Sequence, residues 1–520
     1  MVRPPGTAGM TVRHCIVRDC YRDSVSLLAL SATLSAREGV LGASVTMATP
    51  ANVDAARESG LDGPVDASPS DVLVLVTATT EAVADEALEA AVTALLRPAG
   101  GAGAGTDDAG AGPAHSLRQA LGEAWPAESE PSVVLVSVPG PFAAAEARKA
   151  LDAGLHVMIF SDNVDVAHER ALKELGRERG LLVMGPDCGT CVLDGIPLGF
   201  ANVVRPGPVG LVGASGTGLQ EVATQLHRLG SGASQVIGTG GRDLGAAVGG
   251  LTTESALALL ADDPRTEVIV VVSKPADPAT ARRVLARAAA TGKPVVAALL
   301  GAEPAAAVEH GVVPAATLDE AARLAASLAG SPVPATPAPA PAGTRSVRSG
   351  GILRGLFSGG TLCYEAQLVL AGYGVTVRSN APAPGQLRLD ASAGASAAHT
   401  LVDLGADEYT QGRPHPMIDP GTRDAAVAAA LDEDGVSVVL LDVVLGHGGS
   451  ADPVGGLLAV LGARTGGPQV VAHVCGTDDD PVPRGGVVAA LTSAGVEVAG
   501  SNAEAARRVA VLLGVVGEGS

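Results

Sequence analysis

GPVGLVGASGTGLQEVATQL, residues 207–226, predicts a strand, a tight turn and a helix in direct succession. Val209–Val212 has the apolar pattern of a buried strand, and the helix after the turn has apolar residues at helical spacing. This order directs free backbone N–H groups and the positive end of a helix dipole at one point, where a phosphate or carboxylate would be stabilised. We therefore predict an anion-binding turn made of Ser215, Gly216, Thr217 and Gly218.

The same arrangement occurs a second time. Gly351–Leu356 is a short apolar strand, and Leu362–Ala371 has the pattern of a helix. Two copies in matching contexts are better evidence than one glycine-rich turn, because a repeated unit implies a repeated role. The predicted second anion-binding turn between them consists of Ser358, Gly359, Gly360 and Thr361.

Each copy opens a longer run of alternating strands and helices, which is typical of α/β folds with parallel sheets. We predict two flavodoxin-like modules, at residues 207–330 and 350–520, that pack with their anion-binding turns converging. A Pro/Ala-rich linker, assigned to residues 331–349, separates them. The predicted strands of the two modules are 209–212, 234–237, 268–272 and 295–299, then 351–356, 375–378, 400–404, 436–444, 469–474 and 496–498.

Residues 131–206 read as a Rossmann-like sheet with strands at 132–138, 156–160 and 181–184. We expect a doubly wound sheet, in which ligands lie at the carboxyl ends of the strands. The residues predicted to line those ends are Pro139, Ser161, Asp162, Asn163, Pro186, Asp187 and Cys188.

Residues 11–98 alternate as strand, helix, strand, strand, helix, which predicts a small split βαβ accessory domain. It is either a regulatory or partner-docking module or an accessory domain without chemistry. Residues 99–130, rich in Gly and Ala at their start, are predicted to be a flexible linker.

Charge and composition exclude several functions. The net charge of −20 is distributed along the whole chain rather than concentrated in one segment. A nucleic-acid-binding surface is not expected, because it needs clustered Lys and Arg. No apolar run approaches the roughly 20 residues of a membrane helix, and we expect a cytoplasmic protein without a signal peptide. Cys188-Gly-Thr-Cys191 is a lone CxxC, which we interpret as a loop of small residues rather than a metal site. No metal and no tightly bound cofactor are predicted.

Residues 132–330 resemble the α-subunit of succinyl-CoA synthetase and the NDP-forming acyl-CoA ligases. The matching stretches are VPGPF (138–142), LDAGLHVMI (151–159), MGPDC (184–188) and GPVGLVGASGTG (207–218). Residues 350–515 resemble the second ligase module, found in the β-subunit. DLGADEYTQGRPHPMIDP (403–420) narrows the resemblance to the FdrA group. It implies that the first sheet binds coenzyme A and that both anion-binding turns clasp a phosphohistidine on the way to an acyl phosphate.

The chain departs from this pattern at key points. The loop that carries the family's phosphohistidine reads GAEPAAAVEHGVV (301–313), where His310 is the only histidine. The Gly-rich turn of the CoA-binding sheet and an ATP-grasp domain have no counterpart. The resemblance therefore implies an acid–thiol ligase of the succinate–CoA ligase class, or a carbamoyltransferase derived from it. Oxamate carbamoyltransferase of allantoin breakdown is the specific alternative, and a non-catalytic CoA- or acyl-phosphate-binding scaffold is the third.

These alternatives predict different ligands. CoA, ATP and carbamoyl phosphate are the candidates, together with a small carboxylate substrate. We expect a homo-oligomer or a complex with partner subunits, and no nucleic acid or membrane as partner.

Two local sequences supply candidate catalytic residues. In Gly412–Pro416, Arg413 offers a fork for a carboxylate or phosphate, and His415 is an acid/base or charge donor held between prolines. The alternative is a rigid loop tied by an Arg–Asp pair. His447, followed by Gly448 and Gly449, ends the strongest apolar strand of the second module and predicts a further anion site; the alternative is a solvated histidine. Tyr364 and Glu365 are expected on an ordinary helix surface.

Overall fold

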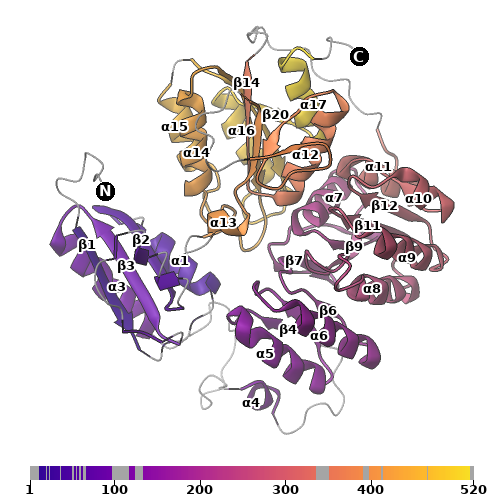
Figure 1. Ribbon diagram of the computed structural model, residues 1–520, viewed down its shortest axis with the longest axis horizontal. Helices are drawn as coiled ribbons and strands as arrows, with labels where there is room; N and C mark the ends of the chain where they lie inside the picture. The colour runs from indigo at the N-terminus through magenta and orange to yellow at the C-terminus, as the bar shows by residue number, and fades with distance from the viewer. Residues whose placement is uncertain are drawn as a thin grey trace. The chain divides into compact units, whose positions relative to one another are not determined.

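The structure is a computed structural model (Figure 1). It describes residues 11–18, 20, 22, 24–35, 37–49, 52–53, 56–57, 60–61, 66–68, 70–96, 116–122, 133–334, 351–389, 398–410, 414–464 and 466–515. The chain divides into two compact units, residues 1–129 with 407–414, and residues 130–406 with 415–520.

The first unit contains a small antiparallel sheet of order β1-β3-β2. β1 and β2 both run antiparallel to the central β3, which confirms the predicted split βαβ arrangement. Leu27, Leu34 and the Ala84–Ala87–Ala91 stripe form its core with Val74 and Val76 of β3. Its elements are β1 (Thr11–Val17), α1 (Ser24–Ser35), β2 (Val40–Met47), β3 (Val72–Ala78), α3 (Glu81–Leu96), α4 (Leu117–Leu121) and α13 (Asp407–Thr410).

The short helix α4 falls inside the predicted linker 99–130, where Ser116 caps it by accepting the Gln119 amide. The rest of that linker, and nearly all of the Pro/Ala linker 331–349, lie outside the described residues.

The second unit begins with a parallel sheet of order β4-β5-β6. Because parallel crossovers are right-handed, sequential strands put both connecting helices on one face, and α5 and α6 do pack together. This sheet is therefore singly wound, and the doubly wound arrangement predicted for it is wrong within the described residues. Its elements are β4 (Val133–Val136), α5 (Gly140–Asp152), β5 (His156–Ile159), α6 (Val166–Arg179) and β6 (Val183–Met184).

The first module has the strand order β10-β9-β11-β12-β13, which in chain order is 2-1-3-4-5, the flavodoxin order. A hairpin of β7 and β8, which the sequence did not predict, extends the sheet beyond β10. The elements are β7 (Thr190–Leu193), β8 (Ile196–Gly199), β9 (Pro206–Ala214), α7 (Gly216–Arg228), β10 (Ala233–Gly238), α8 (Leu251–Asp262), β11 (Val268–Ser273), α9 (Pro278–Ala289), β12 (Val295–Leu299), α10 (Pro304–Glu309), β13 (Val313–Pro314) and α11 (Leu318–Leu328).

The second module repeats this order in β17-β14-β18-β19-β20, and β15 and β16 extend it beyond β17. The shared order confirms two flavodoxin-like modules and favours their origin by duplication. The elements are β14 (Ile352–Phe357), α12 (Gly360–Gly372), β15 (Arg378–Ser379), β16 (Leu387–Arg388), β17 (Thr400–Asp403), α14 (Gly421–Asp432), β18 (Val436–Val444), α15 (Gly455–Gly462), β19 (Gln469–Cys475), α16 (Arg484–Ser493), β20 (Glu497–Ala499) and α17 (Asn502–Leu512).

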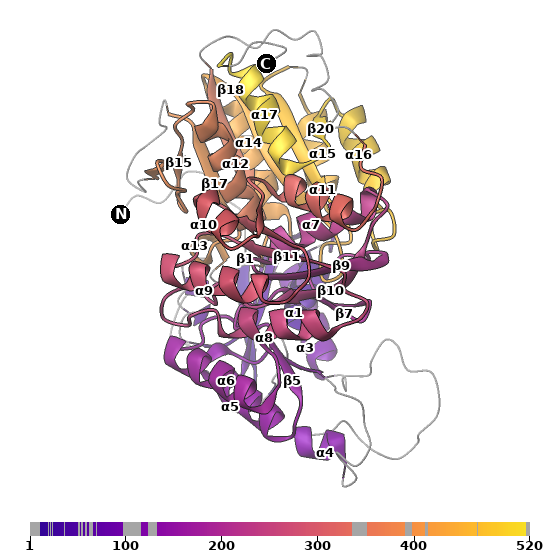
Figure 2. The ribbon, with the colours of Figure 1, turned by 90° about the vertical axis from the view of Figure 1, so that its right-hand side faces the viewer.

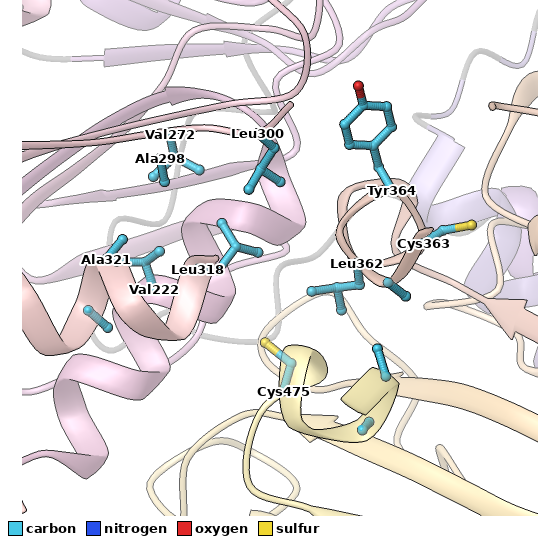
Figure 3. Packing of buried hydrophobic residues seen from close by; sticks show 14 of the residues in the cluster. Val222, Val272, Ala298, Leu300, Leu318, Ala321, Leu362, Cys363, Tyr364 and Cys475 are labelled. Atoms are coloured by element: carbon cyan, nitrogen blue, oxygen red, sulfur yellow. The ribbon is translucent and has the colours of Figure 1, made fainter. Parts of the chain in front are cut away.

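The two modules share one hydrophobic core. Helices α7 and α11 of the first module meet α12 and α17 of the second, as both ribbon views show (Figures 1 and 2). Val222, Ala321 and Leu362 contribute to a single buried cluster that spans both modules (Figure 3). With few aromatic residues, this core is built from Val, Leu and Ala. None of the helices that the structure describes is long and apolar enough to cross a membrane.

Candidate functional site

The N-termini of α7 and α12 meet. The Ser215 and Thr361 hydroxyl oxygens lie 2.7 Å apart, although the two residues belong to different modules. Ser215 also caps α7 by accepting the Gly218 amide at 3.0 Å. The Thr217 methyl group lies 3.0 Å from the position that a Cβ atom on Gly359 would take, so a larger residue at position 359 would crowd Thr217. The structure therefore brings the two predicted anion-binding turns into direct contact.

The α12 N-terminus is already occupied by carboxylates of the chain. The amides of Ser358 and Gly359 donate to the two oxygens of Asp442, at 2.6 and 2.7 Å. Asp442 is fully buried; burial raises its pKa, and the two amides oppose this rise. The carboxylate of Asp403 fills the space beside Gly360. A phosphate at this helix end would therefore meet two carboxylates. An isolated acid inside the apolar strand VSVVLLDVV was the signal that sequence reasoning missed.

The α7 N-terminus differs in this respect. Within the described part of the chain, the amides of Gly216 and Thr217 donate to no protein acceptor, and both residues are partly exposed. The positive end of the helix dipole and free N–H groups both stabilise an anion. The N-terminus of α7 therefore has the groups that an anion-binding site needs.

His415 lies beside the α12 N-terminus. A Cβ atom on Gly405 would be 2.5 Å from His415 Nε2 and 2.7 Å from the Ser358 carbonyl oxygen. His415 Nδ1 accepts the Met417 amide at 3.2 Å, so the neutral ring carries its proton on Nε2. Burial lowers the pKa of His415 to about 4. At neutral pH this side chain therefore presents an N–H donor and no charge. Its predicted companion Arg413 lies outside the described residues.

Aromatic rings connect His415 to the first sheet. The Phe200 ring, which follows β8, lies 6.0 Å from the His415 ring and 5.5 Å from Phe160, which follows β5. Asn202 fixes this segment by donating to the Leu445 carbonyl and to Asp480. The hairpin that the sequence did not predict thus places Phe200 between the strand ends of the first sheet and the second module.

The turn at residues 446–450 packs against the same segment. The His447 amide donates to the Ala201 carbonyl at 2.8 Å, and the Gly448 backbone lies against Phe200. The Ser450 amide donates to Met417, two residues after His415. The imidazole of His447 is exposed, and the Gly449 amide lies 3.4 Å from the Gly446 carbonyl. The structure thus places this turn near His415 and holds it through its backbone.

The strand ends of the first sheet also come together. The Asp187 amide donates to the Ser161 carbonyl, and the Ser161 hydroxyl donates to Val138. Pro139 caps α5, whose first residue, Gly140, packs on the backbone of Asp162 and Asn163. The Pro186 carbonyl and the Asp187 carboxylate face the glycine pair 240–241 of the first module.

Cys188 is the exception among these residues. Its sulfur lies 3.6 Å from that of Cys191, inside the core. The hydrogen bond with Cys191 and burial raise its pKa well above the usual value, so the thiol is inert and does not line the strand ends.

Tyr364 and Glu365 are buried, at 5% and 1% exposure, and the prediction of a helix surface is wrong. The second module alone would leave this face of α12 open, but the first module covers it. Glu365 accepts the Leu318 amide at 2.6 Å and the Asn502 side chain at 2.7 Å. Burial, with Asp319 nearby, raises the pKa of Glu365 to about 8.

This shift predicts a pH-dependent stability. Between pH 4.5 and 8 the folded chain holds the Glu365 proton and the unfolded chain does not, so the free energy of unfolding falls as pH rises through this window. Glu365→Gln is expected to flatten this slope. Denaturant unfolding at pH 5, 6.5 and 8 would check it, with Glu309→Gln at the end of α10 as control; equal slopes in the parent and Glu365→Gln proteins would contradict the assignment.

Comparisons with known proteins match three parts of the chain. Residues 10–110 match the family model described as "AllF, heavy metal-associated domain", residues 206–331 the "Succinyl-CoA ligase like flavodoxin domain", and residues 356–512 "CoA-ligase". Two described cysteines of the first unit are poor candidates for metal ligands. Burial raises the pKa of Cys15, and Cys20 donates to the Leu95 carbonyl in the core. The described residues hold no group of His, Cys, Asp and Glu placed for a metal ion.

Individual relatives extend this similarity. "Uncharacterized protein YahF" of Escherichia coli K12 is 38% identical over 510 residues, 95% of this chain and 97% of that protein. The α-subunit 2 of an ADP-forming succinate–CoA ligase from Archaeoglobus fulgidus is 32% identical over 174 residues, 33% of this chain and 58% of the subunit. A solved acetyl-coenzyme A synthetase 1 of Ca. Korarchaeum cryptofilum, with phosphate and ADP, covers 74% of the chain and 82% of its own at 14% identity, with a TM-score of only 0.31.

The similarity to YahF spans nearly the whole of both chains, and the ligase family models coincide with the two flavodoxin-like modules. The chain therefore belongs to the FdrA family of succinyl-CoA-ligase-like proteins.

Proposed function

We propose that the protein is a group-transfer enzyme of the succinyl-CoA-ligase superfamily that works without a phosphohistidine. One observation carries this proposal: Asp442 occupies the Ser358 and Gly359 amides at the α12 N-terminus, which the resemblance assigns to clasping a phosphohistidine, and the Ser215 and Thr361 hydroxyls lie in contact at 2.7 Å. His310, in the loop that carries the family's histidine, ends α10 as its C-cap residue.

The substrate pair that we favour is carbamoyl phosphate and oxamate. The AllF description of the model that matches residues 10–110 supports this choice, as does the resemblance of residues 403–420 to the FdrA group. In this reaction the oxamate nitrogen attacks the carbamoyl carbon and loses a proton, a C–N bond forms, and the C–O bond to phosphate breaks. The products are N-carbamoyl-oxamate and inorganic phosphate. We expect partner subunits to be needed for turnover.

Acid–thiol ligation is the second candidate. It is favoured by the converging strand ends of the first sheet, where Ser161, Asp187 and Gly140 meet in the position that the resemblance assigns to coenzyme A. An ATP-dependent reaction would require nucleotide chemistry from a partner. A CoA- or acyl-phosphate-binding scaffold would bind these ligands without turnover.

Substrate assays on the full chain, alone and with its partner subunits, separate these candidates. Formation of N-carbamoyl-oxamate and phosphate, with no acid-labile phosphate on the protein, is the result that we expect. Formation of a CoA thioester from an acid, ATP and CoA would favour acid–thiol ligation over carbamoyl transfer as the function of the protein. A phosphohistidine detected by mass spectrometry at His310, His415 or His447 would refute the proposal itself.

We further propose that His415 stabilises negative charge that develops on the transferred group, through its Nε2–H. His415→Ala is expected to lower kcat/KM about 100-fold, in the range found when one oxyanion donor is removed. His415→Gln keeps an N–H donor at a similar distance and is expected to recover part of this loss. His168→Ala, on α6, is the control.

The pH profile tests the same role. Because His415 is neutral from its pKa of about 4 upward, its contribution to the rate is expected to stay constant between pH 6 and 8. A rate that rises or falls with an apparent pKa near 6.5, and loses this dependence in His415→Gln, would contradict a neutral donor.

A further inference from the structure

Asp480 is a buried carboxylate that joins two distant segments of the chain. It lies in the loop between β19 and α16 and is 4% exposed. Its two oxygens accept the Asn202 side chain at 2.8 Å, the Val203 amide at 2.7 Å and the Thr477 amide at 2.8 Å. The Thr477 hydroxyl donates to the Val203 carbonyl at 2.8 Å. Because hydrogen bonds to a carboxylate are about twice as strong as neutral ones, residues 202–203 are held firmly against the second module.

Asn202 extends this network to the end of β18. Its side-chain nitrogen donates to the Leu445 carbonyl at 2.9 Å as well as to Asp480, and its oxygen accepts the Gln220 side chain of α7 at 3.0 Å. Gln220 also donates to the Leu445 carbonyl, at 3.3 Å. Asn202 and Gln220 are each 2% exposed. A shift of residues 200–203 would therefore break several buried hydrogen bonds at once, each of which is costly to leave unmade.

The segment fixed in this way places Phe200 against His415. The centroids of the two rings lie 6.0 Å apart, a separation at which aromatic rings attract each other. The Phe200 ring is itself held by Phe160, at 5.5 Å, and by Gly448, where a Cβ atom would lie 3.1 Å from the ring. Within the described part of the chain, no other aromatic ring contacts His415.

The remaining contacts of the His415 ring come from the second module and involve its nitrogen atoms. Nδ1 accepts the Met417 amide at 3.2 Å, and the Gly405 backbone lies beside Nε2, where a Cβ atom would be only 2.5 Å away. The χ2 torsion of a histidine has a broad energy well, so packing must set the orientation of the ring. Phe200 supplies packing that Met417 and Gly405 do not, and its loss would give the ring room to tilt and move Nε2.

We propose that Phe200 is the positioning residue of His415, and that Asp480 and Asn202 hold Phe200 in place for this role. Phe200 acts through His415, by keeping its Nε2–H beside the α12 N-terminus. The inference rests on the proposed function, in which His415 is the donor to the transferred group. It adds that residues 200–203, which precede the first module, set the precision of a site in the second module. Such sites work when their groups are held to within about 0.5 Å.

The test is a double-mutant cycle on the transfer activity of the full chain with its partner subunits. Phe200→Leu is expected to lower kcat and kcat/KM together, by up to about 100-fold, the cost of misplacing a group by about 1 Å. Phe200→Tyr keeps the ring and is expected to recover most of this loss. In a His415→Ala background, Phe200→Leu is expected to have no further effect, because both changes remove the same interaction. Phe142→Leu, at an exposed position on α5, is the matched control.

A second measurement needs no substrate. Diethyl pyrocarbonate acylates the free lone pair of a neutral imidazole, and mass spectrometry gives the rate at each histidine. In the parent protein the Met417 amide engages this lone pair of His415. Phe200→Leu and Asn202→Ala are expected to raise the acylation rate of His415 several-fold. The exposed His447 is the reference within the same protein, and its rate is expected to stay unchanged.

The outcomes separate this inference from the proposed function. Asn52→Ala, which removes a side-chain hydrogen bond to a carbonyl of the first unit, is the matched control for Asn202→Ala. Additive losses in Phe200→Leu and His415→Ala would overturn the positioning role, and so would an unchanged acylation rate in both Phe200→Leu and Asn202→Ala. A Phe200→Leu protein that melts several degrees lower, with no recovery in Phe200→Tyr, would also overturn it. Faster acylation of His415, without any group transfer by the parent protein, would refute the proposed function and leave Phe200 as the residue that positions His415.

Discussion

Lys173→Met is expected to lower the free energy of unfolding by about 3–5 kcal/mol, the cost of leaving buried charges unpaired. Lys173 on α6 is completely inaccessible, and its ammonium lies 2.9 Å from Glu169, 2.8 Å from Asp243 and 2.8 Å from the Thr239 carbonyl. Asp243 also accepts the amides of Thr252 and Thr253 at the start of α8. Lys173 thus connects α6, which packs on the first sheet, to the loop between β10 and α8 of the first module.

Methionine keeps the length and much of the volume of lysine, so the variant removes charge rather than packing. Lys149→Met on α5 is the matched control, because Lys149 pairs with Glu146 at 2.6 Å on the exposed surface and such pairs contribute at most about 1 kcal/mol. Denaturant unfolding at pH 7 measures both variants. Equal losses for Lys173→Met and Lys149→Met would show that the buried network does not hold these parts together.

Asp442→Ala is expected to cost about 2–4 kcal/mol. The change removes both acceptors from the Ser358 and Gly359 amides and leaves these buried donors unpaired. It also removes the negative charge that compensates the positive end of the α12 dipole, next to which the α7 N-terminus lies.

Asp442→Asn is expected to be intermediate, since it keeps one acceptor and loses the charge. Asp277→Ala is the comparison, because Asp277 caps α9 at a more accessible position by accepting the Thr280 amide, and its loss should be clearly smaller. Melting temperatures of the three variants would rank their losses of stability. An Asp442→Ala protein as stable as Asp277→Ala would mean that water replaces the carboxylate, and the α12 N-terminus could then accept a phosphate.

Much of the fold could be predicted because it is encoded locally. The bounds of β12 and β18 match the predicted ranges residue for residue, since the apolar runs and the residues that flank them mark both strands within the segment. The two strand–turn–helix units could be predicted for the same reason. The singly wound order of the first sheet could not be predicted, because strand order depends on which strands pair.

Only part of the candidate site could be predicted from the sequence. The sequence identified the turns after β9 and β14, and the structure joins them through Ser215 and Thr361. Phe200 was missed because its position depends on a hairpin between two short strands. Asp442 was missed because its partners, Ser358 and Gly359, lie more than 80 residues earlier, separated by 84 and 83 positions.

The sequence by itself thus determined the family, the two modules and the turns that open them, because each depends on residues close together in the chain. Tertiary structure decided which of the two helix N-termini still has free donors. It placed Asp442 on one of them and left the amides of the other without an acceptor among the described residues. It also buried Tyr364 and Glu365, since α12 is covered on both sides only when the modules pack together. These outcomes depend on contacts between distant segments, which periodicity and spacing do not encode.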